Sequence, residues 1–372
     1  MKAGPAGMAA ALLAVVLPAA AVAAAAAAAA ADARPRGGEY AIVDRVAGRD
    51  GMWDYAAVDA TGHRLYVAQT GQISMLELAD GRTWSQVGLP AAMWHGVLPL
   101  EGRGLFIGAN GYAHAVTVFD AATRTLLRAI PVSAGPTLTL KGRLAAFAQL
   151  ADPDALVVEP RTGLIAAVNG GSGEIALVDV VKGAVSGRIQ VGGKLEFAVA
   201  DGQGRLYVNV QTAHEIAVVD VAGHRVVRRI ALSGCVEPKG LAYDRRTDLL
   251  VSGCDNGVAK FILAASGREV ASRRVGNGSD AVIIDEQRHR AFVPSAADGL
   301  LRVFDIQDPA RIRLVQTLRT EPGVRLGALD PSTGRLYLPA ARLGPPQAPY
   351  PWPSMVPGTF HVLVVAPTAA EH

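Results

Sequence analysis

The sequence predicts an all-β fold: a seven-bladed β-propeller of four-stranded blades whose last blade is closed by the N-terminal strand. Two observations carry this prediction. A short apolar motif, first seen as Leu65-Tyr66-Val67, occurs seven times in the chain. Five of the six intervals between copies are 40 to 45 residues and one is 59 residues, and a period near 42 residues is that of propeller blades that contain four strands each. Within each repeat, short runs of β-branched and aromatic residues are separated by turns rich in Gly and Asp, as strands joined by hairpins require.

The N-terminal segment lies outside the predicted propeller. Lys2 precedes an Ala-rich apolar run that extends from Met8 to Ala31, and Ala31-Asp32-Ala33 fits a cleavage site. These features are typical of a secretory signal peptide, although a retained membrane anchor is the alternative because the run is long enough to span a bilayer. We therefore expect a periplasmic or secreted monomer. The chain is divided into a signal peptide (residues 1–33), a short linker (34–39), the propeller (40–367) and a tail (368–372).

The fourth repeat shows how a blade divides into strands. Its four predicted strands are residues 197–200, 206–210, 215–219 and 226–232. An aspartate ends the third strand in this repeat and in three others, at Asp120, Asp179, Asp220 and Asp305. Because such a carboxylate can accept backbone N–H groups of the next turn, we interpret these acids as structural.

The seventh repeat supplies only three strands, residues 326–329, 336–339 and 360–365. Residues 40–46 resemble the fourth strands of the other repeats, so we expect this N-terminal segment to complete the last blade. Such a closure removes the open sheet edge that would otherwise invite aggregation.

Three repeats carry degenerate copies of a Tyr-Val-Thr-Asn signature: Leu65-Tyr66-Val67, Leu105-Phe106-Ile107-Gly108-Ala109-Asn110 and Leu206-Tyr207-Val208-Asn209. On these residues the chain resembles the YVTN-repeat β-propeller family, the YncE-like group of exported bacterial proteins. The full signature is absent from every repeat. The resemblance implies a seven-bladed propeller of the WD40/YVTN repeat-like superfamily in the periplasm or outside the cell, and it implies no particular reaction.

The chain has two cysteines, Cys235 and Cys254. They flank the first two predicted strands of one blade, and an exported protein meets an oxidising compartment. We therefore expect a disulfide between them. The alternative is a thiolate metal site, which needs further ligands that are not close in the sequence.

Ionisable residues recur where the innermost strand of each blade begins. In every blade except the second, the residue five positions before the acidic turn residue is ionisable. In the second blade, the ionisable residue is the direct neighbour of that position. The seven residues are Asp54, His95, Asp154, Glu196, Lys239, Asp280 and Arg325. Because the innermost strands begin at the same end of the channel, we expect a mixed-charge ring at the channel mouth. Convergent polar groups in a concave mouth suit a ligand site, whereas salt bridges between neighbouring blades are the alternative.

Tryptophans stand beside two of these positions. Trp53 precedes Asp54, and Trp94 precedes His95. Their rings could stack on a planar or sugar-like ligand, or they could plug the channel as packing residues. Two longer loops, residues 133–151 and 344–357 with Trp352, are expected on the same face.

Charge and motifs narrow the function classes. The 372 residues carry a formal net charge of +3, with Lys and Arg scattered through the turns, which argues against nucleic acid as the main partner. The sequence contains neither a Gly-x-Ser-x-Gly elbow nor a His-Glu-x-x-His motif. We therefore expect a non-catalytic module of the cell envelope that binds a small molecule or an envelope protein.

A metal-dependent hydrolase of the lactonase type is the alternative. A divalent cation such as Ca²⁺ would bind carboxylate oxygens of the ring, with Asn169 or Asn209 as neutral ligands. A carboxylate or His95 would then move the proton. Lys239 and Arg325 place positive charge in the same ring and argue against this alternative, and the spacing selects no metal-ligand set.

Overall fold

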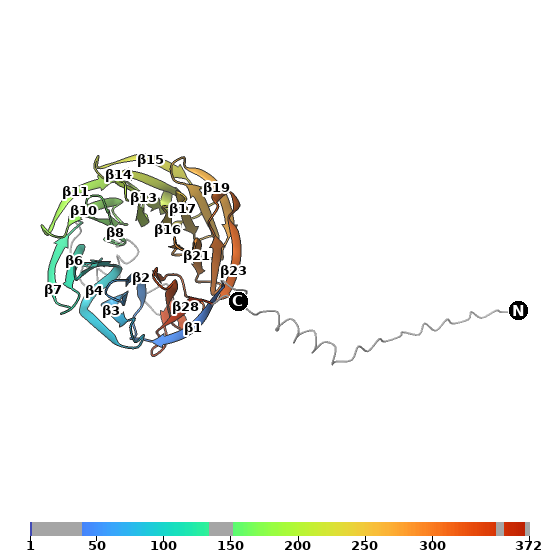
Figure 1. Ribbon diagram of the computed structural model, residues 1–372, viewed down its shortest axis with the longest axis horizontal. Coiled ribbons are helices and arrows are strands. Elements are labelled where there is room, and N and C mark those ends of the chain that lie inside the picture. Colours follow the sequence, from blue (N-terminus) through green and yellow to red (C-terminus); the bar gives the residue numbers. More distant parts are fainter. Residues whose placement is uncertain (2–38, 134–151, 347–352, 369–372) are drawn as a thin grey trace. The chain divides into compact units, whose positions relative to one another are not determined.

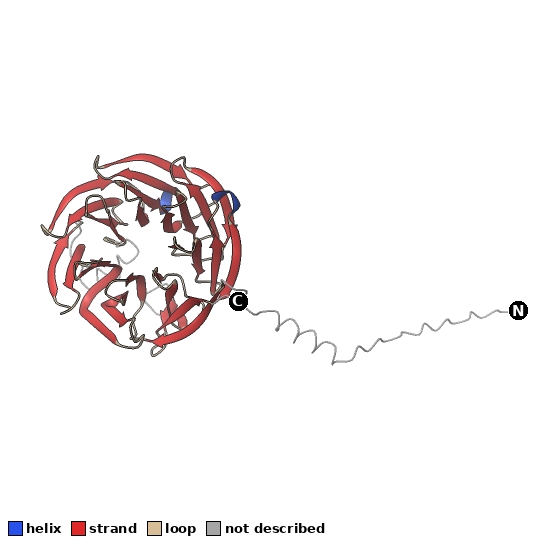
Figure 2. Cartoon of the chain, viewed as in Figure 1, coloured by secondary structure: helices blue, strands red, loops and turns tan. Residues whose placement is uncertain are grey.

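The computed structural model describes residues 39–133, 152–346 and 353–368, together with Met1. Residues Glu39–Pro367 form one compact unit. The predicted signal peptide and most of the predicted linker and tail lie outside the described residues. The regular secondary structure of the unit Glu39–Pro367 is almost entirely β-strand, and the unit forms a β-propeller with its sheets arranged around a central opening (Figure 1, Figure 2).

Four of the sheets are antiparallel and contain four consecutive strands each. Blade 3 contains β8 (Leu156–Val158), β9 (Ile165–Asn169), β10 (Glu174–Asp179) and β11 (Ala184–Gln190). Blade 4 contains β12 (Leu195–Ala200), β13 (Arg205–Val210), β14 (Glu215–Asp220) and β15 (Arg225–Ala231). Blade 5 contains β16 (Pro238–Asp244), β17 (Leu249–Cys254), β18 (Val258–Leu263) and β19 (Arg268–Arg274). Blade 6 contains β20 (Ile283–Asp285), β21 (Arg290–Ser295), β22 (Leu300–Asp305) and β23 (Arg313–Arg319).

The first two repeats share one six-stranded sheet. Its strands are β2 (Trp53–Asp59), β3 (Arg64–Glu77), β4 (Trp84–Leu100), β5 (Leu105–Asn110), β6 (Ala115–Asp120) and β7 (Leu126–Pro131). The first part of β3 pairs with β2 and its second part pairs with β4, with Gly71 at a positive φ of 79° between them. The start of β4 pairs with β3 and its end pairs with β5. We interpret this sheet as two joined blades. When it is counted as two, the number of blades is the seven predicted from the repeat.

The N-terminal strand closes the last blade, as predicted. This blade has the strand order β1 (Tyr40–Ala47), β28 (His361–Pro367), β25 (Arg335–Ala340) and β24 (Ala328–Asp330). The antiparallel pairing of β1 with β28 extends from Tyr40 opposite Pro367 to Ala47 opposite His361. The two ends of the propeller unit therefore meet in one sheet. The loop before β28 carries a small hairpin of β26 (Leu343–Pro346) and β27 (Pro353–Met355).

Apolar residues between neighbouring blades form the core. One cluster joins Ile107 and Val116 of the second blade to Ile165 and Ala176 of blade 3, all at most 1% exposed. The middle strand β14 is buried on both faces and is a nearly continuous apolar run, whereas the outer strand β15 alternates exposed residues with residues that are mostly half-buried. No helix in the described part of the chain is long and apolar enough to cross a membrane.

The acidic turn residues are structural, as the sequence indicated. Asp120 Oδ1 accepts the backbone N–H groups of Ala122 and Thr123. Asp179 accepts those of Val181 and Lys182 in the same way. These hydrogen bonds lower the pKa of both carboxyls, so the turns are stabilised by the ionised form.

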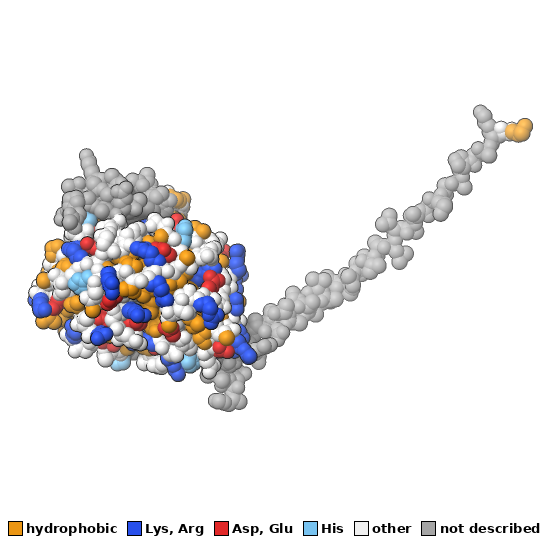
Figure 3. All heavy atoms as spheres, turned by 90° about the horizontal axis from the view of Figure 1, so that it is seen from above, with side chains coloured by type: hydrophobic (Ala, Val, Ile, Leu, Met, Phe, Trp, Pro, Cys, Tyr) orange, Lys and Arg blue, Asp and Glu red, His pale blue; other side chains and the backbone are white. Residues whose placement is uncertain are grey.

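Arginines of two outer strands tie their blade to the preceding one. Arg188 of β11 pairs with Glu174 and donates to the carbonyl of Val132, which lies just after β7, at 2.8 Å. Arg229 of β15 pairs with Glu215 and donates to the carbonyl of Val191, which lies just after β11, at 2.6 Å. Other Lys and Arg side chains are spread over the side of the propeller seen in Figure 3, among acidic and apolar ones.

We expect Arg229→Ala to lower the free energy of unfolding by about 1 kcal/mol, because it removes a charged hydrogen bond to a carbonyl together with an ion pair. Urea unfolding followed by circular dichroism measures the change. Arg225→Ala is the control on the same strand, since that side chain is 72% exposed and lies 4.0 Å from Asp220. Equal effects of the two substitutions would contradict the role given to Arg229.

Candidate functional site

β-Bulges place four of the predicted ring residues. In each case an apolar residue of the innermost strand pairs with the second strand, and regular pairing resumes only three residues later. The paired residues are Trp53, Trp94, Leu195 and Pro238, and the next residues are Asp54, His95, Glu196 and Lys239. Because a bulge changes the direction of the side chains within it, the apolar residue stays in the core while its neighbour is free to face the channel.

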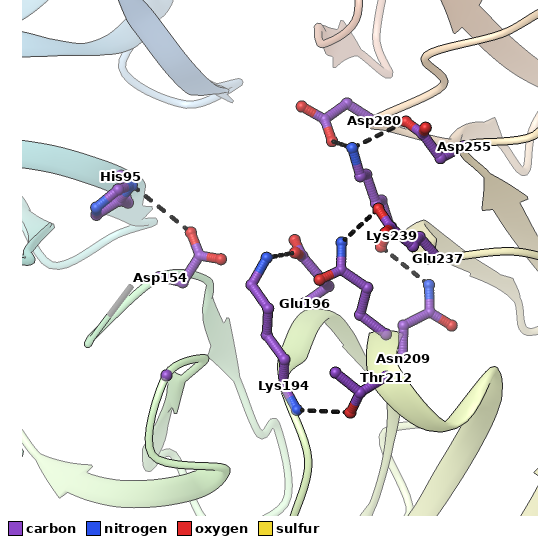
Figure 4. Close-up of polar contacts among 12 residues, drawn as sticks. His95, Asp154, Lys194, Glu196, Asn209, Thr212, Glu237, Lys239, Asp255 and Asp280 are labelled. Atoms are coloured by element: carbon purple, nitrogen blue, oxygen red, sulfur yellow. Dashed lines mark hydrogen bonds and ion pairs between the residues drawn. The ribbon is translucent and has the colours of Figure 1, made fainter. Parts of the chain in front are cut away.

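A cavity of about 550 Å³ lies where these side chains converge. Six of the seven predicted ring residues line it: Asp54, His95, Asp154, Glu196, Lys239 and Asp280. Five further residues complete the lining: Tyr55, Lys194, Gln211, Glu237 and Leu326. Figure 4 shows Asp154 and His95 on one side, with Lys194, Glu196 and Lys239 facing them from blades 4 and 5.

An aromatic pair crosses the channel. The rings of Tyr55 on β2 and Phe197 on β12 lie 5.0 Å apart between centroids, although these strands belong to blades that are not neighbours. Burial raises the pKa of Tyr55 well above its ordinary value, and the charges of Asp154 and Glu196 raise it further. The hydroxyl therefore stays protonated at neutral pH, beside carboxylates that line the cavity.

His95 lies between two carboxylates. Its Nδ1 is 2.9 Å from Asp54 Oδ2 and 3.8 Å from Asp154 Oδ1. Burial alone would lower the pKa of His95, but the hydrogen bond to Asp54 and the charges of Asp154, Asp54 and Glu196 outweigh it and raise the pKa to about 9. Burial raises the pKa of Asp154 well above its usual range, against the opposing charge of His95. The titrations of His95 and Asp154 are therefore coupled to each other.

The opposite wall is built from lysine–carboxylate pairs. Lys194 Nζ is 2.7 Å from Glu196 Oε1, and burial raises the pKa of Glu196 against the opposing charge of Lys194. Lys239 Nζ is 2.9 Å from Asp255 Oδ1 and 3.9 Å from Asp280 Oδ1. Burial opposes the charge of Lys239, but Asp280 and Asp255 outweigh it and the pKa of Lys239 is raised.

The seventh ring residue, Arg325, does not line the cavity. Its Nε is 3.1 Å from Asp280 Oδ2, and its guanidinium donates to the carbonyl of Trp53 at 2.7 Å. The guanidinium carbon also lies 5.5 Å from the centre of the Trp53 ring. Arg325 thus ties the strand it precedes to β2 and to the loop before β20.

The two tryptophans are core residues and do not line the cavity. Trp53 is 2% exposed and contacts Phe360, while Trp94 is 1% exposed and contacts Phe119. This packing favours the second of the two interpretations given to them, and stacking on a ligand would require both rings to leave the core. The pair that crosses the channel is instead Tyr55 and Phe197. Trp352 and most of the loop at residues 133–151 lie outside the described residues.

The two asparagines considered as metal ligands face other partners. Asn209 Nδ2 donates to the carbonyls of Lys239 and Gly240, and its Oδ1 accepts from Ser252. Asn169 Nδ2 donates to the carbonyl of Val132. Each amide therefore connects neighbouring blades.

Sequence reasoning missed Lys194 and Glu237, although a signal was present. Each stands two residues before a ring position, Glu196 and Lys239 respectively. Both residues precede the innermost strands β12 and β16, and Glu237 has a left-handed φ of 50°, so the shared offset of two residues from the ring position, and not the period of a strand, is the signal that could have found them. Gln211 comes directly after β13, and no pattern in the repeat indicated it.

The predicted disulfide is present. Cys235 and Cys254 are 5.5 Å apart between Cα atoms, and both are buried. The bond connects the loop that carries Glu237 to the end of β17, next to Asp255. It therefore supports the wall of the cavity that contains Lys239.

Comparison with known proteins supports the fold alone. No protein-family model matches the chain, and no curated protein matches it. Among solved structures, the chain is similar to a chain in the crystal structure of the mitotic checkpoint complex, with 14% identity and a TM-score of 0.64. The match covers 91% of this chain and 96% of that one. Because 1719 chains of solved structures match, this likeness does not select one activity. The chain thus has the fold of a β-propeller of a widely shared type.

Proposed function

We propose that this protein is an exported β-propeller that binds a small charged molecule in the mouth of its channel. The cavity of about 550 Å³, lined by carboxylates and by cationic side chains from different blades, is the observation that supports this function. Its volume lies in the range of small-molecule sites, and a few convergent polar groups in a concave site give orientation and specificity.

Charges of both signs favour a ligand that itself carries more than one charged group. Lys194 and Lys239 can each exchange part of their contact with a protein carboxylate for a ligand anion, while Glu237 can accept from a ligand cation. A protein partner is the other occupant consistent with a propeller. The mouth favours the small molecule because its charged groups are partly buried, as at Glu196, whose side chain is 12% exposed.

The export part of the proposal is supported by two features. The sequence begins with a segment typical of a signal peptide, and the propeller contains a disulfide, which persists in oxidising compartments. A YVTN-like, YncE-like membership is part of the same proposal and is supported by the degenerate signatures. Fractionation of expressing cells, with mass spectrometry of the mature N-terminus, tests whether the protein is exported. A cytosolic protein with reduced cysteines would contradict export.

A thermal-shift screen tests the ligand site. The probes are free amino acids, di- and tricarboxylates, polyamines and sugar acids. We expect at least one class to raise the melting temperature of the wild-type protein, and the rise to fall by more than half in Lys194→Met with Glu237→Gln. Lys182→Met is the control, because Lys182 is 77% exposed and lies in a turn. If no probe class shifts the wild type, or if the double variant responds as the wild type does, the proposed site is wrong.

The second candidate is a metal-dependent hydrolase. One observation favours it: Asp54, His95 and Asp154 bring three potential ligand atoms within 4.8 Å of one another at the edge of the cavity. A cation there could polarise a carbonyl of a bound ligand. Hydrolysis of a panel of lactones and esters by metal-loaded protein, absent from the chelated protein, would favour this candidate over simple binding.

A further inference from the structure

We infer that Asp54, His95 and Asp154 bind one divalent cation of the transition-metal type, such as Zn²⁺, at the edge of the channel-mouth cavity. This inference deepens the proposed function, because the bound ion would give the cavity a fixed positive charge on which an anionic group of a ligand can rest. Only this role of the ion in binding a ligand rests on the proposed function. The ion site itself depends on the three side chains.

The spacing of the three ligand atoms fits such an ion. His95 Nδ1 lies 2.9 Å from Asp54 Oδ2 and 3.8 Å from Asp154 Oδ1. One potential ligand atom from each of the three residues lies within 4.8 Å of the other two. Ligands at 2.0–2.2 Å from a tetrahedral Zn²⁺ are separated from each other by roughly 3.3–3.6 Å. Small rotamer adjustments therefore bring these three atoms around one ion. The cavity beside them leaves room for a fourth ligand.

The kind of donor selects the kind of metal. One imidazole nitrogen with two carboxylate oxygens suits Zn²⁺ and its neighbours in the first transition row, whereas Ca²⁺ needs six to eight oxygens. The other carboxylates at the channel mouth are paired with cationic side chains of the protein, since Glu196 pairs with Lys194 and Asp280 pairs with Arg325. The amide of Asn209 is held by backbone carbonyls and Ser252. The oxygen-rich Ca²⁺ set considered from the sequence is therefore not assembled.

The charge around the cavity is a second and independent reason to expect a bound divalent cation. The formal charges of the lining residues and their direct partners include six carboxylates: Asp54, Asp154, Glu196, Glu237, Asp255 and Asp280. Four cationic groups accompany them when His95 is protonated: His95, Lys194, Lys239 and Arg325. The mouth is thus short of positive charge although the whole chain has a formal net charge of +3. A divalent cation supplies that charge on the side where no lysine or arginine pairs with Asp54 or Asp154 among the described residues.

The polar contacts of His95 lie on the Nδ1 side of its imidazole. Its Nε2 is buried and has no hydrogen-bond partner among the described residues, so these residues do not supply the acceptor that usually receives the second N–H of a metal-bound histidine. Within the described part of the chain, the imidazole of His95 makes its polar contacts with the two carboxylates. Each of the three residues comes from a different innermost strand or from the residues just before it, so closure of the ring holds their relative positions.

Isothermal titration of the metal-free, full-length protein with Zn²⁺ and with Ca²⁺ tests the inference. We expect one Zn²⁺ per chain, binding at least tenfold weaker in His95→Gln and in Asp154→Asn, and no comparable Ca²⁺ binding. His63→Asn and Glu101→Gln are the controls, because both side chains are exposed on turns, and they should bind Zn²⁺ as the wild type does. Unchanged Zn²⁺ binding in both site variants, or no stoichiometric Zn²⁺ in the wild type, overturns the inference.

A second measurement does not depend on the variants folding. Co²⁺ bound by the wild-type protein should give visible absorption bands of a low-symmetry, four- or five-coordinate ion, and Zn²⁺ should displace it. The weak spectrum of a six-coordinate aqueous-like ion would overturn the inference. A failure here together with a positive thermal-shift screen would leave a ligand site without a metal, whereas metal binding with a negative screen would separate the ion from the proposed ligand.

Discussion

Replacing both Cys235 and Cys254 with alanine is expected to lower the free energy of unfolding by about 3 kcal/mol, because the disulfide closes a loop of this size in the unfolded chain. The two cysteines are 19 residues apart and are 3% and 0% exposed. Alanine avoids placing a hydroxyl in that apolar cluster. Urea unfolding under oxidising conditions measures the loss, which corresponds to a fall of roughly 6 °C in melting temperature for a domain of this size.

Reduced wild-type protein is the matched comparison for the disulfide. It should unfold at a urea concentration close to that of the double variant, and the double variant should not respond to reductant. The bond also holds the loop of Glu237 next to Asp255, whose backbone N–H donates to the carbonyls of Val236 and Glu237. Equal stability of reduced and oxidised wild type would contradict the expected contribution.

Metal-free protein is expected to lose stability as the pH rises from about 6.5 to above 9. The folded pKa of His95 is about 9, whereas an unfolded histidine titrates near 6.5. The folded state therefore binds the proton more tightly, so this contribution is complete below pH about 6.5 and is lost as the pH rises through 9. Its size is on the order of 3 kcal/mol. The raised pKa of Asp154 acts in the same direction.

Several groups face His95 and set the size of this effect. Asp54, Asp154 and Glu196 favour its protonated form, while burial opposes it. Tyr55 lies among the same carboxylates and is kept protonated by its burial and by those charges. The pH profile therefore reports on His95 and Asp154 together.

Urea unfolding in chelator at several pH values between 6 and 10 measures this dependence. His95→Gln should flatten the profile, because the uncharged amide cannot take up the proton. His63→Asn should keep the wild-type profile, since His63 is exposed and its positive φ of 50° is one that asparagine tolerates. Parallel profiles for the wild type and His95→Gln would show that His95 does not carry the effect.

Much of the fold could be predicted because its determinants are local and repeated. The period of the apolar motif and the Asp and Gly turns identified the strands, and the missing fourth strand of the seventh repeat predicted the pairing of residues 40–46 with the last blade. The disulfide was predictable because only two cysteines exist and they flank adjacent strands. The merging of the first two blades into one sheet was not predicted, since it depends on how β3 and β4 continue through their bends.

The candidate site was predictable in its positions but not in its contacts. Counting within the repeat found six residues that line the cavity, because equivalent positions of a circular repeat face the same axis. It also placed Arg325 in the ring, where the guanidinium instead reaches Asp280 and the carbonyl of Trp53. The sequence also did not decide whether the two tryptophans lie in the core or face the channel. Within a bulge, one residue can point into the core while its direct neighbour faces the channel.

The sequence by itself determined the repeat, the closure by the N-terminal strand and the ionisable residue at the start of each innermost strand, because these depend on patterns within about 42 residues. Only the tertiary structure decided which charges meet. The contact of Tyr55 with Phe197, the two carboxylates around His95 and the pairing of Lys239 with Asp255 and Asp280 join residues from different strands or blades. Their separations are set by closure of the ring and by the reach of individual side chains, and no local pattern encodes either.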